Sequence, residues 1–198
     1  MCTPLGALAQ TEDSFGDAAA DPFRLFEQGQ GAHARGEFEK ALEFYERAIK
    51  VRPDFPEAEF QRGNALVSLG RLPAAHLAFE RAIALRKDWS LPYSARGALF
   101  VREGKDQEAE KLFRQALSLD HRDNVALRML AEIRLRSSDP AEALTLAQQA
   151  TSEQQAPIGA WIVRAMAERA TGDKKSAHTS LEHVLQVEPE NLAALLER

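Results

Sequence analysis

Small residues return along this chain at a constant interval of 34 residues, and no insertion or deletion interrupts the interval. Stepping by 34 from the first member of one column gives Gly36, Gly70, Gly104, Ser138 and Gly172. Four further columns keep the same register; they start at Gly29, Ala41, Tyr45 and Ala48. Five columns in one register indicate a tandem-repeat architecture, in which each unit buries its apolar face only against its neighbours.

Each repeat is predicted to contain two amphipathic helices. A helix-forming stretch of about 14 residues runs to the Gly36 column, a short polar turn follows, and a second amphipathic stretch completes the repeat. Glycine suits the left-handed position just after a helix. Large side chains in the Gly29 or Ala41 columns would push the two helices apart. The aromatic column that starts at Tyr45 is expected to fill the gap beside these small residues.

These columns, with a closing proline at Pro53 and Pro189, resemble the tetratricopeptide repeat (TPR) family over residues 22–191. The resemblance implies an all-α fold, a right-handed superhelical solenoid of antiparallel helix pairs. First helices would line the concave face and second helices the convex face. The sequence departs from the pattern in the fourth repeat, which lacks its glycine and its aromatic residue, and at three closing positions, Lys87, His121 and Gln155. We expect the fourth repeat to be the loosest.

The period divides the chain into three parts. Five repeats are expected at 22–55, 56–89, 90–123, 124–157 and 158–191. Residues 1–21 are expected to form a flexible acidic leader, because they carry four acidic residues and no Lys or Arg. Residues 192–198 restart the pattern. They form either a short capping helix, with Leu192, Leu195 and Leu196 packed on the fifth repeat, or the start of a truncated sixth repeat.

The leader also bears on localisation. Ala7-Leu8-Ala9 followed by Gln10 matches the A-x-A end of a secretory signal peptide. Only six residues precede Ala7, so the basic start and the long apolar stretch of such a signal are absent, and the match can equally be chance. The protein is expected to be cytoplasmic, or periplasmic or secreted if this segment is a signal-peptide remnant. No apolar run approaches the roughly 18 residues that span a bilayer.

No pattern indicates catalysis, a cofactor or a metal site. The stretch TGDKKS, residues 171–176, lacks the leading glycine and the Gly-Lys-Ser ending of a phosphate-binding loop. His178 and His183 are five residues apart, which does not place two ligands on one helix face. Trp89 and Trp161 are expected to pack within or between repeats. The net charge of −5 argues against non-specific nucleic-acid binding. We therefore expect neither an enzyme nor a cofactor.

Binding is the remaining route to function. In the TPR family, positions 2, 5, 9, 12 and 13 of each first helix point into the concave groove. The candidate binding residues selected from these positions are Phe26, Gln30, Phe60, Asn64, Arg102, Arg128, Glu132, Arg136, Ile162, Met166 and Arg169. The first four lie in an apolar, aromatic half of the groove. The later positions form a basic cluster of four arginines, offset in part by Glu132.

Arginine pairs bidentately with carboxylates, so the cluster predicts a protein or peptide partner with apolar anchors and an acidic stretch. The alternative interpretation is that these arginines are solvated and paired with neighbouring acids. Chaperone-binding TPR proteins clamp a C-terminal carboxylate with lysine, asparagine and arginine at fixed groove positions. No register supplies that set here; the second repeat, for example, offers Phe60, Asn64, Ala95, Val125 and Met129. A receptor for Hsp70 or Hsp90 tails is therefore excluded.

Two functional hypotheses remain from the sequence. The first is a non-catalytic scaffold that mediates protein–protein interaction through the concave groove. The second is an N-terminal recognition or self-association module of a larger enzyme or signalling protein. Self-association through exposed terminal repeats is a third alternative.

Overall fold

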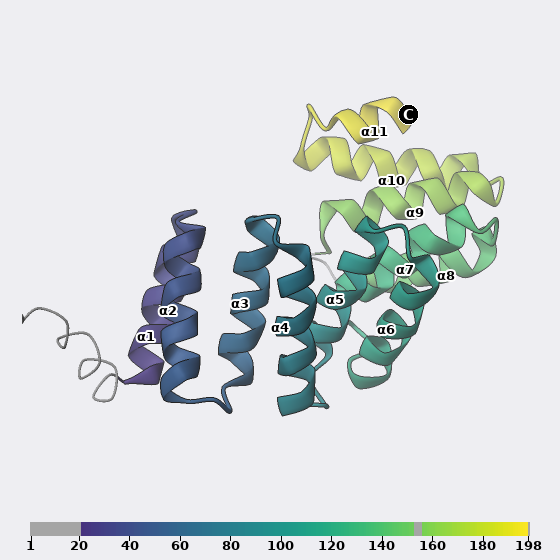
Figure 1. Ribbon diagram of the computed structural model, residues 1–198. Coiled ribbons are helices and arrows are strands. Elements are labelled where there is room, and N and C mark those ends of the chain that lie inside the picture. Colours follow the sequence, from purple (N-terminus) through teal and green to yellow (C-terminus); the bar gives the residue numbers. More distant parts are fainter. Residues whose placement is uncertain (1–20, 153–155, 198) are drawn as a thin grey trace, which may run out of the picture. The chain divides into compact units, whose positions relative to one another are not determined.

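The computed structural model describes residues 21–152 and 156–197. Within these ranges the chain forms eleven α-helices and no strand; the first ten are arranged as five consecutive helix pairs, and α11 follows the last pair (Figure 1). The predicted all-α solenoid of antiparallel helix pairs is confirmed. The leader expected at residues 1–21 lies outside the described residues, apart from Asp21, whose carboxylate accepts a hydrogen bond from the Phe23 N–H at the start of the first helix.

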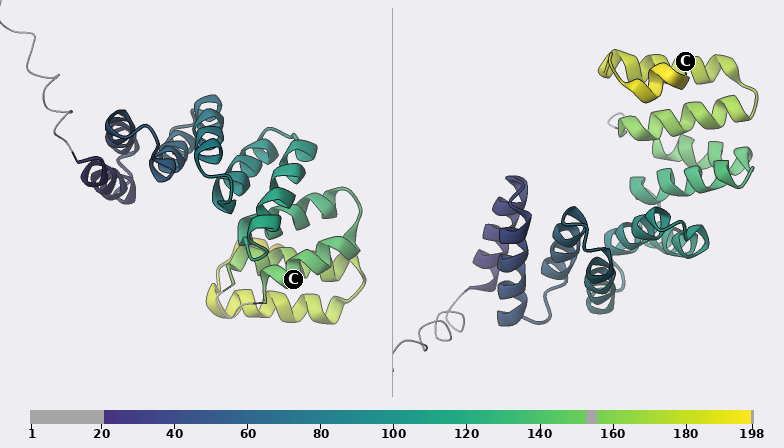
Figure 2. Two further views of the ribbon diagram at one scale, coloured as in Figure 1. Left: turned by 90° about the horizontal axis from the view of Figure 1, so that it is seen from below. Right: turned by 45° about the horizontal axis from the view of Figure 1, so that its top comes forward.

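The helices divide into two compact parts, Met1–Lys87 and Asp88–Arg198, called here the N-terminal part and the C-terminal part. The N-terminal part contains α1 (Pro22–Ala34), α2 (Phe38–Val51), α3 (Pro56–Ser68) and α4 (Leu72–Leu85). The C-terminal part contains α5 (Ser90–Arg102), α6 (Asp106–Leu119), α7 (Asn124–Arg136), α8 (Pro140–Ala150), α9 (Ile158–Ala170), α10 (Lys174–Val187) and the short α11 (Leu192–Glu197). In the C-terminal part, α7 lies beside both α5 and α9, as the views of Figure 2 show for α7 and α9.

The two helices of a pair approach closely where a glycine of the first faces an aromatic ring of the second. A Cβ atom added to Gly29 would lie 2.5 Å from the Tyr45 ring, and one added to Gly97 would lie 2.7 Å from the Phe113 ring. Real Cβ atoms essentially never come so close to a neighbouring atom. The ring therefore occupies the volume that a side chain would need, as the small and aromatic columns predict.

In the last two repeats, other residues replace the glycine and the aromatic ring at this helix contact. The glycine column becomes Ala131 and Ala165, and the aromatic column becomes Ala147 and Leu181. All four side chains are buried. A methyl group is tolerated in the first helix because the ring opposite has been replaced by a smaller side chain.

The turn inside each repeat uses a left-handed residue. The glycines of the Gly36 column have φ between 71° and 92°. Ser138 takes the same conformation in the fourth repeat, with φ of 61°, although a residue with a Cβ atom adopts it at a cost. The position, rather than the residue type, is thus what the repeat preserves.

A buried polar contact ties the third repeat to the fourth. Asp123 is 4% exposed and precedes α7, where its carboxylate accepts a hydrogen bond from the Ala126 N–H at 3.0 Å. Its other oxygen accepts a hydrogen bond from the Ser94 hydroxyl of α5 at 2.9 Å. Because both carboxylate oxygens are satisfied, the buried charge stabilises the junction between α5 and α7.

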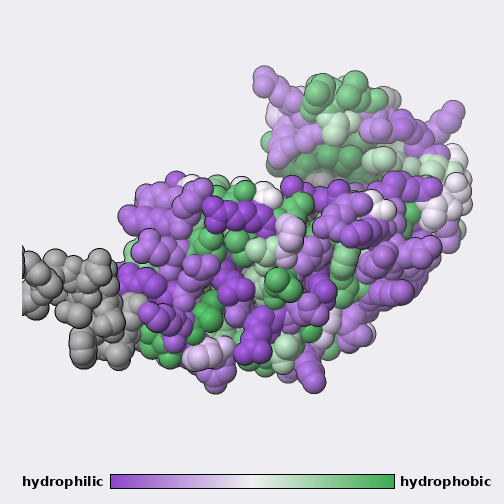
Figure 3. Space-filling view, in the orientation of Figure 1, coloured by the Kyte–Doolittle hydropathy of each residue, from purple (hydrophilic) through white to green (hydrophobic). Residues whose placement is uncertain are grey.

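The end of the described chain differs from the capping prediction. In the capping alternative, Leu192, Leu195 and Leu196 pack on the fifth repeat, but in the structure they are 68%, 48% and 76% exposed. Ala194 is the residue that packs there, fully buried in a cluster with Leu181 of α10 and others. A helix of six residues presents one narrow face to its neighbours, and here that face carries the alanine. Figure 3 accordingly shows hydrophobic surface over α11.

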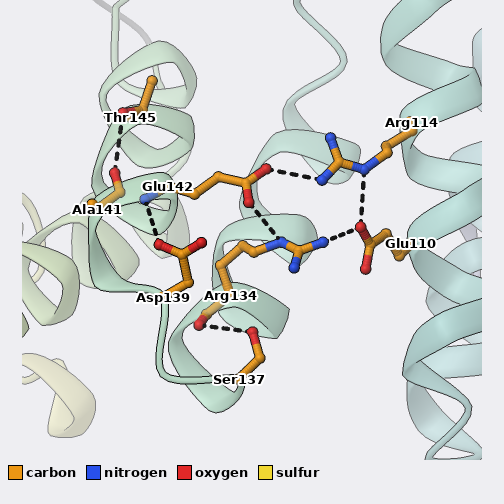
Figure 4. Close-up of polar contacts among 8 residues, drawn as sticks. All are labelled: Glu110, Arg114, Arg134, Ser137, Asp139, Ala141, Glu142 and Thr145. Atoms are coloured by element: carbon orange, nitrogen blue, oxygen red, sulfur yellow. Dashed lines mark hydrogen bonds and ion pairs between the residues drawn. The ribbon is translucent and has the colours of Figure 1, made fainter.

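Charged side chains link α6, α7 and α8 in the C-terminal part (Figure 4). Arg134 of α7 pairs with Glu110 of α6, and its Nε lies 3.0 Å from a carboxylate oxygen of Glu142 of α8. Arg114 of α6 completes a ring of alternating charges, because it lies 2.9 Å from the same two carboxylates. These ion pairs therefore connect three helices from two repeats.

Candidate functional site

In the N-terminal part, the aromatic candidate residues contribute to the core. The Phe26 ring lies 5.1 Å from that of Phe55 and 5.8 Å from that of Tyr45, measured between ring centroids. Phe60 lies 5.7 Å from Phe79 in the same way. Both Phe26 and Phe60 are half-buried, so each side chain combines packing between helices with partial exposure.

The polar candidate residues of the N-terminal part make fewer contacts within the core than the aromatic ones do. Gln30 is exposed on α1. Asn64 is half-buried on α3 and donates a hydrogen bond to the Gln61 side chain at 3.1 Å. Its amide is therefore held in place and retains its own side-chain oxygen as an acceptor.

In the C-terminal part, a pocket of about 360 Å³ opens between α7 and α9. Its lining residues are Arg128, Glu132, Leu135, Arg136, Gly159, Ile162, Val163 and Met166. Five of the candidate binding residues are therefore brought together here: Arg128, Glu132, Arg136, Ile162 and Met166. Leu135 and Gly159 also lie at groove positions, but nothing in the sequence marked them as binding residues. Val163 lies outside the groove positions, which is why the sequence did not indicate it.

The pocket has apolar walls and a polar rim. Leu135 of α7 and Ile162 and Met166 of α9 are half-buried aliphatic side chains, and Val163 is 4% exposed. Arg128 Nη1 lies 2.5 Å from Glu132 Oε1, one helical turn further along α7. Each of these two charges neutralises the other, so the pocket favours an apolar group with a neutral polar edge.

Three of the four arginines in the basic cluster are paired with acids of the chain itself. Besides the Arg128–Glu132 pair, Arg136 makes a bidentate contact with Asp106 of α6 at 3.0 and 3.1 Å. Arg169 pairs with the carboxylate of Glu197 and donates to its backbone carbonyl at 3.0 Å.

Arg102, exposed at the end of α5, is the one member of the cluster without a partner among residues 21–152 and 156–197. These contacts favour the alternative interpretation of a basic cluster that is largely neutralised within the chain.

One ionisable residue away from the pocket breaks the repeat pattern. Glu59 of α3 is 4% exposed, in a column that holds Leu25 and Leu127 in other repeats. Burial raises the pKa of its carboxyl, and the charges of Arg62 and Arg81 oppose that rise. Arg62 lies 3.1 Å from Glu59 Oε2, but the geometry is not that of a hydrogen bond, so this buried oxygen has no hydrogen-bond donor among the residues that the structure describes.

Comparison of this sequence with models of known protein families identifies its family. Residues 29–70 match a model described as a TPR repeat, and residues 94–157 match one described as a tetratricopeptide repeat; together they cover more than half of the chain. The chain belongs to the tetratricopeptide repeat family. A TPR fold suggests a scaffold for protein–protein interaction. No curated protein sequence matches this one.

Solved structures of TPR proteins resemble this one at low sequence identity. YrrB, described as a TPR protein with an unusual peptide-binding site, is 19% identical, with 89% of this chain and 91% of that chain covered and a TM-score of 0.64. The thermophilic TPR protein TTC0263 of Thermus thermophilus is 18% identical, with 89% and 96% covered and a TM-score of 0.69. A chain of the APC/C hetero-tetramer Cut9–Hcn1 is 18% identical over 88% of this chain and 35% of that one, with a TM-score of 0.78. These similarities show the fold alone.

Two other kinds of site are absent from the described ranges. No group of three or more histidine, cysteine, aspartate or glutamate side chains there is placed to hold a metal ion. Among the same residues, no helix has both the length and the hydrophobicity that crossing a bilayer requires.

Proposed function

We propose that this TPR protein is a non-catalytic scaffold that binds a peptide segment of a partner protein in the groove lined by α7 and α9. The pocket between these helices is the observation that carries the proposal. Its volume of about 360 Å³ lies near the lower end of the range for ligand sites, roughly 300–1,000 Å³. Such a pocket suits a side chain of a bound peptide better than a whole cofactor.

Two further observations support a peptide ligand. The lining combines aliphatic side chains with a few polar groups, which is the usual composition of a recognition pocket. YrrB, a protein of the same fold, is described as having a peptide-binding site. The sequence predicts a partner with an acidic stretch. Because the other arginines of the cluster are paired with acidic residues of this chain, we expect that stretch to contact Arg102.

The alternative is that the same groove serves a longer protein as a recognition or self-association module. In both alternatives the groove binds the partner. They differ in whether further domains of the same protein act on that partner.

The test uses a random peptide library displayed on phage and selected on the intact protein. Peptides should be enriched, and Met166→Glu, which places a charge in the pocket wall, should weaken their binding at least tenfold, about 1.4 kcal/mol. Thr179→Glu is the matched control, because Thr179 is exposed on the second helix α10 and does not line the pocket. Enriched peptides that bind Met166→Glu as well as wild type would contradict the proposal.

A further inference from the structure

Gly159 leaves a gap where the other repeats carry a side chain. It is the second residue of α9, and the equivalent residues of the other four repeats are Phe23, Glu57, Leu91 and Val125. In the C-terminal part, Leu91 is 44% and Val125 is 40% exposed. Because Gly159 lines the pocket, an aliphatic side chain at this position would take up part of the pocket volume.

The neighbouring α7 side chain shows how closely this space is bounded. A Cβ atom on Gly159 would lie 3.4 Å from Arg128 Cδ, which is ordinary van der Waals contact, and the glycine has no left-handed φ that would forbid a side chain. A larger residue would therefore fit the helix but extend into the pocket beside Arg128. Neither the backbone conformation nor the packing of α9 therefore requires a glycine at position 159.

A second determinant lies on α5. Arg102 is exposed and has no partner in the described part of the chain, and α5 lies beside α7. Adjacent helices are about 8–10 Å apart, so Arg102 is roughly 10–20 Å from the pocket between α7 and α9. An extended peptide advances about 3.3 Å per residue, so this separation corresponds to about three to six residues.

We propose that the gap at Gly159 is a specificity pocket for one large apolar side chain of a partner peptide, and that Arg102 pairs with an acidic residue about three to six positions away in the same peptide. The inference rests on the proposed function and names its ligand. The Arg128–Glu132 pair supplies the rim, with N–H donors and carboxylate acceptors that can bond the peptide backbone without adding net charge. Recognition at the pocket is apolar, and recognition at Arg102 is electrostatic.

The pocket is tested with Gly159→Leu and the phage-displayed library selected on wild-type protein. The enriched peptides should share a large apolar residue and an Asp or Glu at the stated spacing. Gly159→Leu should reduce their affinity at least tenfold while the melting temperature stays the same or rises, because leucine favours a helix more than glycine does. Ala141→Leu is the matched control: it adds leucine at the second position of α8, where Ala141 is exposed and outside the pocket.

The acidic contact is tested with Arg102→Gln. This variant should weaken a selected peptide at least fivefold, and it should leave unchanged the affinity of the same peptide with its acidic residue replaced by the amide. If Met166→Glu abolishes binding but Gly159→Leu and Arg102→Gln do not, the specificity assignment is wrong and the groove function stands. If none of the three variants weakens binding, both proposals fail together.

Discussion

Gly97 of α5 lies against the ring of Phe113 of α6 so closely that an added methyl group would come within 2.7 Å of it. Phe113 is fully buried, and its ring is held by the cluster that also contains Ala109 and Leu130. The ring therefore has no room to move away from a larger residue at position 97.

This contact predicts that Gly97→Ala destabilises the protein by about 1–3 kcal/mol, measured as the free energy of unfolding in urea. The result is informative because glycine to alanine inside a helix ordinarily stabilises by about 0.5–1 kcal/mol. Gly31→Ala in α1 supplies that reference, since a Cβ atom there would meet only the Arg35 guanidinium at 3.4 Å. Equal effects of the two substitutions would show that the ring contact does not limit the helix spacing.

Tyr45 is the aromatic residue of the first repeat, and it is fully buried. Its hydroxyl oxygen makes no hydrogen bond to any residue in the described ranges, and the equivalent residues of the next two repeats are Phe79 and Phe113. Tyr45→Phe should therefore raise the free energy of unfolding by about 1 kcal/mol, the cost of a buried unsatisfied group. Phe113→Tyr should lower it by at least as much. A destabilised Tyr45→Phe variant would mean that the hydroxyl has a bonding role.

Burial also raises the pKa of Tyr45 to about 12. The folded pKa is above the ordinary value of about 10, so the unfolded chain loses this proton first as the pH rises. The stability contributed by the neutral phenol is present below pH 10 and is lost between about pH 10 and 12. Ultraviolet titration should show one tyrosine that ionises only near pH 12 or on unfolding, and Tyr45→Phe should remove that step.

The ring of charges on α6, α7 and α8 predicts unequal effects of its two arginines. The Arg134 side chain is 17% exposed and the Arg114 side chain is 51% exposed, although both contact Glu110 and Glu142. Arg134→Gln should cost about 1–3 kcal/mol because it leaves partly buried carboxylates underpaired. Arg114→Gln should cost less than about 1 kcal/mol, as exposed ion pairs do. Thermal unfolding compares the two, and a larger loss for Arg114→Gln would reverse this assignment.

Glu59 predicts a specific dependence of stability on pH. Its folded pKa is raised by burial, so the carboxyl stabilises the fold while it is protonated, and that stability is lost as the pH rises through the folded pKa. Glu59→Gln resembles the protonated acid. Its unfolding free energy should match that of wild type near pH 4 and exceed it by about 1 kcal/mol at pH 7. A constant difference between the two proteins at both pH values would show that Glu59 does not titrate in this way.

The repeat pattern predicted the fold because its signal is local and recurs. Gly97 and Phe113 can be assigned to a helix contact from spacing alone, since the same pair types return at the same offset. The left-handed conformation of Ser138 was not predicted, because the sequence showed only that the fourth repeat lacks the glycine of this column. The packing of α11 was not predicted, because one incomplete repeat offers both Ala194 and its neighbouring leucines to the core, and the spacing does not choose between them.

The site was predicted less completely than the fold. Arg128, Ile162 and Met166 were selected from groove positions, and all three line the pocket between α7 and α9. They did not indicate that Arg136 and Arg169 would bond Asp106 and Glu197, because side-chain pairing between helices depends on geometry that no repeat column encodes. Gly159 holds a groove position but was not selected as a candidate binding residue, because a residue that acts by lacking a side chain has no chemical signature in a sequence.

The most direct test of the groove uses methyl signals from methionine in protein labelled with ¹³C at the methionine methyl groups. The chain has three methionines; Met166 lines the pocket, while Met129 packs on the core cluster and serves as an internal reference. Titration with a library-selected peptide should shift the Met166 methyl signal most, in proportion to the fraction bound, and Gly159→Leu should require at least tenfold more peptide for the same shift. A peptide that saturates the protein while the Met166 signal stays in place would contradict binding in the groove between α7 and α9.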